Sequence, residues 1–343
     1  MSGVGFRDVV ELRNLPAPAK LNLFLHVTGR RPDGYHLLET VFELVDLYDR
    51  IDLRLVDDDA IRLVDAPGDW SADSDLTVRA ARLLATHTGC RLGVEIALRK
   101  RIPTGGGMGG GSSDAATVLL GLNHLWRLGL PREHLQRLAL RLGADVPAFL
   151  FGSRAFARGV GEELVALDPT PSQYVVVAPA VQVPTASVFG RAELTRNTKP
   201  IKLFGLSRGR PVRRGKNDLE PVVLAAWPPV AEALQALRKA ADAEGAEGHL
   251  ARMTGSGACV FCPVADEPVA ESIRQRLERL AIGQVFVVRS LDRHPLRDWS
   301  FAEAQVPKDF RRTTQGRPTE VQPSSARSSE RAASGPLGSS QVG

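Results

Sequence analysis

The stretch Pro103-Thr-Gly-Gly-Gly-Met-Gly-Gly-Gly-Ser-Ser-Asp-Ala-Ala116 places a nearly continuous run of glycine directly before an amphipathic apolar pattern. Glycine is costly to order, so such a run is useful mainly where backbone N–H groups must approach an anion closely. A following helix would add its partial positive charge and its unpaired N–H donors. The segment therefore predicts a phosphate-binding loop, and a nucleotide-dependent enzyme is the leading hypothesis.

Three alternative roles for the glycine run fit the sequence less well than a phosphate-binding loop. Gly105, Gly107 and Gly110 match the dinucleotide pattern G-x-G-x-x-G, but almost any spacing matches in such a run. An expected strand precedes the run and Glu133 follows about 20 residues on, as that pattern requires, yet the Ser-Ser-Asp continuation suits phosphate and metal contacts better. A Walker P-loop is excluded because no Gly-Lys-Ser/Thr follows. A flexible linker is disfavoured because an amphipathic helix begins at once, with Ser112 or Ser113 as its expected N-cap.

Length, charge and hydrophobicity limit the number of domains and the kinds of partner that the protein can have. The chain has 343 residues, enough for two domains. Its net charge of +5 is mild and aromatic residues are few, which disfavours nucleic acid as a partner. The sequence has no signal pattern and no apolar run of the roughly 20 residues needed to span a bilayer, so we expect no membrane association and a cytoplasmic protein.

The three cysteines indicate a reducing compartment rather than a disulfide framework. Cys259 and Cys262 have C-x-x-C spacing, but they lie in an expected buried strand. Residues three apart on a strand point to opposite faces, so we expect neither a shared metal nor a redox pair.

Periodicity predicts strands and helices in mixed order, which indicates an α+β fold. Strands are expected at 21–27, 37–47, 51–56, 94–98, 174–178 and 283–290, and helices at 75–86, after the glycine run, after Pro131, and at 186–194, 222–243 and 267–280. We expect one domain over 1–165 and a second over 166–304. Residues 305–343 are rich in Ser, Arg, Pro, Gln and Gly, a composition that predicts a disordered tail.

Two polar positions are candidates for the chemistry. Lys20 and Asn22 share one face of a short expected strand, whose other face is apolar. Asp145 follows Gly143, the expected C-cap of one helix, in a tight connection before Pro147. Because the P-loop lysine is missing, the phosphates need a cation from elsewhere, and Lys20 is the candidate. Taken alone, Lys20 would more commonly be an ordinary surface lysine, and Asp145 an aspartate that forms hydrogen bonds at a junction between helices.

Three motifs in this order resemble the signatures of the GHMP kinases, the family of galactokinase and of homoserine, mevalonate and phosphomevalonate kinases. They are Pro18 to His36, Pro103 to Asp114, and Arg252 to Phe261. The resemblance covers residues 18 to 261. It implies a two-domain α+β fold, with an ATP-binding N-terminal domain like ribosomal protein S5 and a ferredoxin-like C-terminal domain.

The resemblance also implies an activity: transfer of the γ-phosphoryl group of ATP, with Mg²⁺, to an alcohol. By likeness, Asp145 would be the general base, Lys20 would keep it ionised and stabilise the transferred phosphoryl group, and Asn22 would orient the pair or the substrate. The implied phosphate contacts are Pro103, Gly105, Gly106, Gly107, Gly109, Gly110, Gly111, Ser112 and Ser113. The metal ligands remain unknown.

The acceptor is indicated by shorter motifs. Asp33-Gly-Tyr-His36, Gly143-Ala-Asp-Val-Pro147 and Asn217-Asp-Leu-Glu220 are similar to family members that phosphorylate a cytidine-diphosphate-linked alcohol. This likeness implies that a small group of residues contacts the substrate, with the first three gripping cytosine: Tyr35, His36, Phe189 and Thr185.

We therefore expect an ATP-dependent kinase of a cytidine-diphosphate-linked small molecule, acting as a monomer or weak homodimer. A kinase of homoserine or mevalonate is disfavoured, because such an alcohol needs no nucleobase grip. A catalytically silent nucleotide-binding module is disfavoured by the presence of both Lys20 and Asp145. A dinucleotide oxidoreductase is the weakest alternative.

Overall fold

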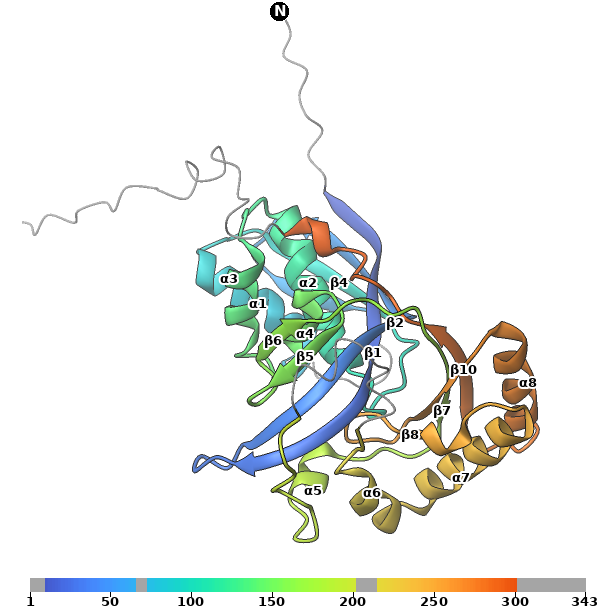
Figure 1. Cartoon of the computed structure of the whole chain (residues 1–343). Coiled ribbons are helices and arrows are strands. Elements are labelled where there is room, and N and C mark those ends of the chain that lie inside the picture. Colours follow the sequence, from blue (N-terminus) through green and yellow to red (C-terminus); the bar gives the residue numbers. More distant parts are fainter. Residues whose placement is uncertain (1–9, 66–72, 202–214, 301–343) are drawn as a thin grey trace, which may run out of the picture. The chain divides into compact units, whose positions relative to one another are not determined.

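The computed structural model describes residues 10–65, 73–201 and 215–300 (Figure 1). These residues all belong to one compact unit. The predicted tail, residues 305–343, lies outside the described ranges. Helices and strands occur in mixed order, so the predicted α+β class is confirmed.

The first sheet is built on a long antiparallel hairpin of β1 (Glu11–Arg30) and β2 (His36–Val56). The other edge of β2 pairs with β4 (Gly93–Arg99) over its second half and with β5 (Ala155–Arg158) near its start. Two short strands complete the sheet: β3 (Ile61–Val64), parallel to β4, and β6 (Glu163–Ala166), antiparallel to β5.

The second sheet has four antiparallel strands in the order β10-β7-β9-β8. They are β7 (Gln173–Ala178), β8 (Arg252–Met253), β9 (Val260–Val264) and β10 (Gln284–Arg289). The predicted domain boundary at 165/166 coincides with the end of β6, before the chain enters this sheet. Because the described residues of both sheets belong to one compact unit, the division into two domains stays a prediction.

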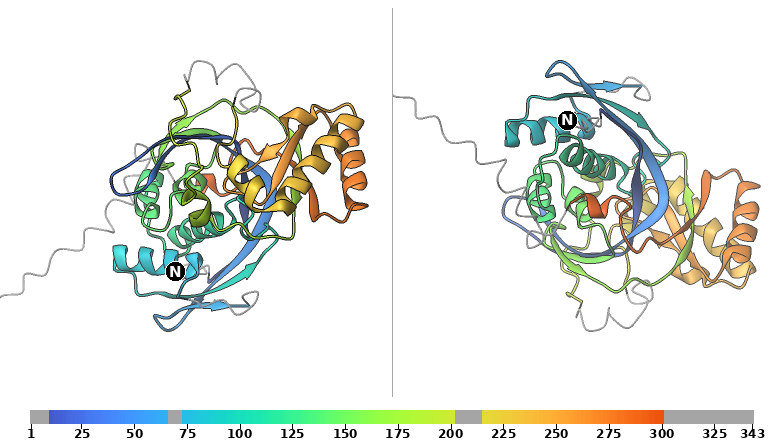
Figure 2. Two further views of the ribbon diagram at one scale, coloured as in Figure 1. Left: turned by 90° about the horizontal axis from the view of Figure 1, so that it is seen from below. Right: turned by 90° about the horizontal axis from the view of Figure 1, so that it is seen from above.

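Helices accompany each sheet, and the views in Figures 1 and 2 agree that the two groups lie on opposite sides of the β1–β2 hairpin. The first group is α1 (Leu76–Thr88), α2 (Gly110–Leu125), α3 (Arg132–Ala139) and α4 (Val146–Phe151). The second group is α6 (Glu220–Ala226), α7 (Pro228–Ala243) and α8 (Glu267–Glu278). The short α5 (Thr185–Phe189) approaches the start of β2, where Phe189 meets His36.

Three apolar layers hold these elements together. Leu53 and Leu119 belong to the layer between the first sheet and its helices, and Leu237 and Val260 to the layer beside the second sheet. Phe261 belongs to a third layer, in which side chains of β1 and β2 meet those of β7 and β9. Each large side chain buried in this way stabilises the fold by about 1.5–3 kcal/mol. The third layer fixes β1 relative to the turn before β9, and the site lies at that junction.

The structure corrects two predicted boundaries near polar residues. The strands predicted at 37–47 and 51–56 are one strand, β2. Asp49 fell between the two predicted strands, but it is fully buried and its carboxylate accepts the backbone N–H groups of Arg101 and Ile102. The helix predicted at 222–243 is two helices, because Pro228 and Pro229 can only begin a new helix, α7.

Several predicted helix ends were also wrong. The helix after the glycine run begins at Gly110, with Gly109 rather than Ser112 or Ser113 as its N-cap. Gly109 has a φ of +73°, a left-handed conformation that glycine adopts without strain. The helix predicted at 186–194 ends at Phe189, and Leu140 rather than Gly143 is the C-cap of α3. Val146 is the first residue of α4, although it precedes a proline and such residues favour an extended conformation.

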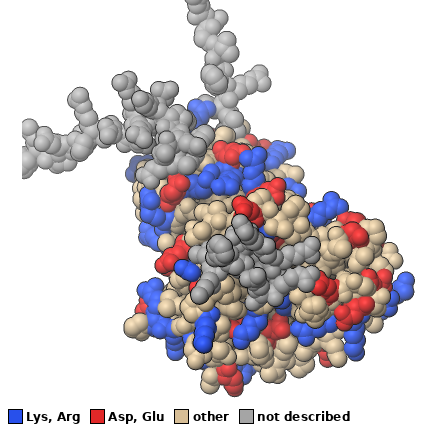
Figure 3. Space-filling model, viewed as in Figure 1, with Lys and Arg blue, Asp and Glu red and all other residues tan. Residues whose placement is uncertain are grey.

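Acidic and basic side chains are interspersed over the described part of the face shown in Figure 3. That part of the surface therefore carries no broad single-sign patch of the kind that binds a phosphate backbone.

Candidate active site

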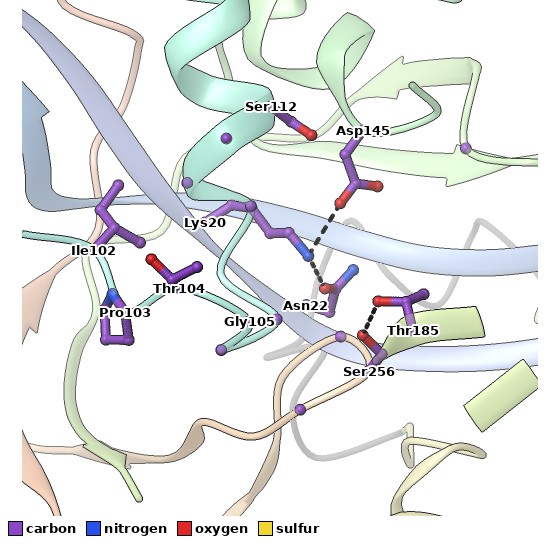
Figure 4. A pocket seen from close by; sticks show the side chains of 18 of the residues that line it. Lys20, Asn22, Ile102, Pro103, Thr104, Gly105, Ser112, Asp145, Thr185 and Ser256 are labelled. Carbon is purple, nitrogen blue, oxygen red and sulfur yellow. Dashed lines mark hydrogen bonds and ion pairs between the residues drawn. The ribbon is translucent and has the colours of Figure 1, made fainter. Parts of the chain in front are cut away.

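A cavity of about 730 Å³ lies where β1, the glycine loop (103–111), α5 and the turn at 254–257 meet (Figure 4). Most of the predicted site residues line it: Lys20, Asn22, Pro103, Gly105, Gly106, Gly107, Gly109, Gly110, Gly111, Ser112, Asp145, Thr185 and Phe189. The fold thus brings together residues from elements far apart in the sequence. Ser113, Tyr35 and His36 are not among its lining residues.

The glycine loop rests on the turn between β8 and β9. The backbone N–H groups of Ala258 and Cys259 donate to the carbonyls of Gly105 and Gly106, both at 3.1 Å. A Cβ atom on Gly107, whose φ is +73°, would lie 2.2 Å from the carbonyl oxygen of Thr254. Glycine is therefore required for this packing, and the packing leads the chain into the N-terminus of α2 at the cavity wall.

Lys20 reaches from β1 to the centre of the cavity, between Asn22 and Asp145 (Figure 4). Its Nζ donates to Oδ1 of Asn22 and lies 3.5 Å from Oδ2 of Asp145. The residue is only 3% exposed, and its Nζ is 5.4 Å from the centre of the Phe42 ring. Burial lowers the pKa of Lys20, and the Asp145 carboxylate opposes that shift. The side chain of Asp145 is 39% exposed, so its carboxylate is open to a substrate.

Asn22 is held by two hydrogen bonds, one from its backbone and one from its side-chain amide. Its backbone N–H donates to Oγ1 of Thr254 and its Nδ2 donates to Oγ1 of Thr40, both at 2.9 Å. The nitrogen of the amide is thereby committed, so its oxygen is turned to the Lys20 ammonium. The predicted strand alternation holds here, because Leu21 and Leu23 enter the core while Lys20 and Asn22 face the cavity.

The predicted cytosine residues gather at the α5 end of the cavity, with one exception. The rings of His36 and Phe189 are 4.8 Å apart at 33°, and Phe189 lines the cavity. The hydroxyl of Thr185 lies 2.7 Å from that of Ser256, also on the cavity wall. Tyr35 is 63% exposed in the turn between β1 and β2 and contributes no cavity lining. Burial lowers the pKa of His36, and the guanidinium groups of Arg196 and Arg30 lower it further.

A cluster of three ionisable residues near the glycine loop was not identified from the sequence. Nζ of Lys100 donates to the carboxylates of Asp49 and Asp114, the latter at 2.6 Å. Burial raises the pKa of Asp114 to about 8, since Lys100 compensates only in part and the Asp49 carboxylate adds to the shift. The basic run 99–101 was visible in the sequence, but its pairing with two distant aspartates was not.

Ser113 does not reach the cavity. It lies in the first turn of α2, fully buried, and its backbone N–H donates to the carbonyl of Gly109 at 2.9 Å. Its hydroxyl has no hydrogen-bond partner among the described residues. The half-buried neighbour in the same turn, Ser112, lines the cavity instead.

Cys259 and Cys262 are unpaired and belong to different apolar layers, so they face opposite sides of the second sheet as predicted. Within residues 10–65, 73–201 and 215–300 no three His, Cys, Asp or Glu side chains form a group that could hold a metal ion. The helices of these ranges include none long and apolar enough to cross a membrane.

Two family models match the chain. The model of the GHMP kinases N terminal domain matches residues 75–153, and that of the GHMP kinases C terminal domain matches residues 205–282. Together with the relatives described next, these matches show that the chain belongs to the GHMP kinase family. It is a small-molecule kinase that uses ATP, as the sequence motifs implied.

Within this family, the chain is similar to proteins named 4-diphosphocytidyl-2-C-methyl-D-erythritol kinase. The one from Thiobacillus denitrificans is 55% identical over 284 residues, which are 83% of this chain and 97% of the relative. The one from Aromatoleum aromaticum is 52% identical over 295 residues, 85% of this chain and 98% of the relative.

Comparison with solved structures gives the same family and fold. A crystal structure of 4-(cytidine 5'-diphospho)-2C-methyl-D-erythritol kinase has a TM-score of 0.67 and 36% identity, covering 82% of this chain and 98% of that one. The homoserine kinase from Cytophaga hutchinsonii has a TM-score of 0.64, covers 86% of this chain and 98% of its own, and at 21% identity supports the fold alone. The predicted GHMP kinase fold class is therefore confirmed.

Proposed function

We propose that this chain transfers the γ-phosphoryl group of ATP to the 2-hydroxyl of 4-diphosphocytidyl-2-C-methyl-D-erythritol, in the non-mevalonate route to isoprenoid precursors. One observation carries the proposal: the Lys20–Asp145 pair, the glycine loop and Phe189 line one cavity, and the Phe189 ring lies 4.8 Å from the ring of His36. A phosphate-binding loop, a general base and an aromatic pair for a nucleobase are thus available to one pair of substrates. The names of the relatives at 55% and 52% identity supply the particular acceptor.

Asp145 is the proposed general base. Its carboxylate is partly exposed to the cavity, and the buried Lys20 ammonium stands 3.5 Å away. A base of this kind must reach within about 3 Å of the hydroxyl proton. The same ammonium faces the glycine loop, where it stabilises negative charge on the transferred phosphoryl group. Asn22 holds the ammonium in place through its amide oxygen.

The donor phosphates lie, in this proposal, along the glycine loop and the first turn of α2. Gly109, Gly110 and Gly111 line the cavity where their N–H groups are the orphan donors of the helix start. A loop rich in glycine lets the backbone approach a phosphate without side-chain obstruction.

Mg²⁺ fits the donor set of this cavity, although the described residues form no dedicated cage. Mg²⁺ in kinases is held by substrate phosphates, water and one or two protein oxygens. The hydroxyl of Ser112 and the carboxylate of Asp145 are among the oxygens that the cavity offers. When bound, the ion would neutralise charge on the phosphates of ATP.

The proposal is tested by measuring ATP consumption by the full chain with three acceptors: the cytidyl substrate, homoserine and mevalonate. We expect turnover with the first alone, and a product phosphorylated at the 2-hydroxyl. Turnover with another acceptor, or none with the cytidyl substrate, would overturn it. Asp145→Asn should lower turnover by about a hundredfold or more, whereas the exposed-site control Asp168→Asn should not.

A further inference from the structure

Arg196 connects His36 and the segment of Phe189, whose two rings form the proposed cytosine site. Neither the sequence motifs nor the cavity lining identify this arginine. Its Nε donates to Nε2 of His36 at 3.0 Å. The rest of the guanidinium donates to backbone carbonyls at the end of α5 and just beyond it: Phe189 at 3.1 Å, Arg191 at 2.6 Å and Leu194 at 3.0 Å. One planar group therefore holds a side chain of β2 and the chain segment that carries Phe189.

The contact with His36 has a chemical consequence. A neutral imidazole has one N–H donor and one acceptor nitrogen, and the tautomer is set by the bond that the acceptor receives. Because Nε2 of His36 accepts from Arg196, the proton of the neutral ring is assigned to Nδ1. Protonation of Nε2 would place two donors against each other, and both burial and the nearby Arg196 and Arg30 charges lower the His36 pKa.

The contacts with the carbonyls fix the second ring. Without Arg196, the backbone carbonyls of Phe189 and Arg191 would lose this hydrogen-bond donor. This segment is anchored further along the chain, where Leu194 is buried and the N–H of Thr198 donates to the carbonyl of Val27 at 3.1 Å. Arg196 thus stands between a fixed anchor on β1 and the ring of Phe189.

We propose that Arg196 is a positioning residue for the acceptor substrate: it holds His36 as the Nδ1–H tautomer and in register with Phe189, so that the pair recognises a pyrimidine base. Because Nε2 is occupied by Arg196, the ring can only donate to a ligand through Nδ1–H, which suits the acceptor N3 of cytosine, whereas uracil has an N–H at N3. This inference rests on the proposed function, because it assigns the base of that same acceptor.

The experiment compares Arg196→Gln and Arg196→Lys with wild type and with Arg191→Gln, a matched control in the same segment whose guanidinium packs on Trp227. We expect the KM for the cytidyl substrate to rise about tenfold in both Arg196 variants, the effect of losing one well-made hydrogen bond to a positioned group. The KM for ATP and kcat should stay unchanged, as should all constants of Arg191→Gln. A merely structural role would move all constants together.

A double-mutant cycle with His36→Ala supplies the second readout. If Arg196 acts through His36, Arg196→Gln should raise the KM little further in the His36→Ala background. Additive effects would overturn the inference, as would an unchanged KM in Arg196→Gln or the unfolding of both Arg196 variants. Failure of the proposed function looks different, because wild type itself would then not turn over the cytidyl substrate.

Discussion

Nζ of Lys20 lies 3.5 Å from Oδ2 of Asp145, and the two side chains differ sharply in exposure. The lysine comes from the middle of β1 and is buried, whereas the aspartate is the N-cap residue of the short helix α4 and is open to the cavity. The accessible carboxylate of Asp145 is free to meet a hydroxyl, while the buried cation stays beside it. In the proposed mechanism the two roles are separated: Lys20 stabilises charge and Asp145 takes the proton.

Lys20→Met should lower kcat by about a hundredfold or more, the usual effect of removing a preorganised charge from a transition state. The KM for the cytidyl substrate should change far less, because the proposed cytosine site is formed by other residues, His36 and Phe189. Steady-state kinetics with both substrates measure this. Lys199→Met, at an exposed lysine, is the control and should behave as wild type. A Lys20→Met enzyme with near-normal kcat would remove the ammonium from the mechanism.

Gly107→Ala should destabilise the fold and weaken ATP binding together. The residue has a φ of +73°, and a Cβ there would meet the Thr254 carbonyl at 2.2 Å, so the loop must leave the turn that supports it. Gly111→Ala is the matched control for stability alone, since its Cβ would meet only Leu76 at 3.5 Å and alanine favours a helix; ATP binding is compared with wild type. Urea unfolding and ATP titration measure both. Equal stability of the two variants would contradict the packing argument.

Asn217→Ala should lower the free energy of unfolding by about 1–3 kcal/mol, because it leaves buried carbonyls without a donor. Its Nδ2 donates to the carbonyls of Met253 and Gly255 at 2.9 and 2.8 Å, and the residue is 3% exposed. These bonds hold the turn on which the glycine loop rests, so the KM for ATP should rise as well. Gln275→Ala removes a surface amide and should change neither quantity. A variant as stable as this control would count against the role of Asn217.

The sequence predicted those parts of the site that depend on short-range rules. Lys20 and Asn22 were placed together by strand alternation, and the structure puts both on the cavity wall. Asp145 was placed in a tight connection because Gly143 and Pro147 flank it, and it does sit between α3 and α4. The order of the three motifs indicated the family, which the matched models confirm.

The parts that the sequence did not predict depend on pairing between distant segments. Asp49 was left between two predicted strands because nothing near it shows that Lys100 and two backbone N–H groups come to meet it. Arg196 reaches His36 on β2 from beyond the end of α5, and no periodicity relates the two. Ser112 or Ser113 was expected as the N-cap because a serine commonly caps a helix, but Gly109 is the N-cap. Ser113, which the family resemblance implied at the phosphates, is buried in the core.

Asp114→Asn should flatten the dependence of stability on pH. An aspartate in the unfolded chain loses its proton near its ordinary pKa, about 3.9, whereas burial beside Asp49 raises the pKa of folded Asp114 to about 8. Between these values the folded state binds more protons, so the free energy of unfolding falls as pH rises, by at most about 1.4 kcal/mol per pH unit for this group. Asparagine carries no such proton. Urea unfolding from about pH 5.5 to 8 should therefore give a shallower slope for Asp114→Asn than for wild type or the exposed-site control Asp168→Asn, and parallel slopes would show that Asp114 is ionised in the folded protein.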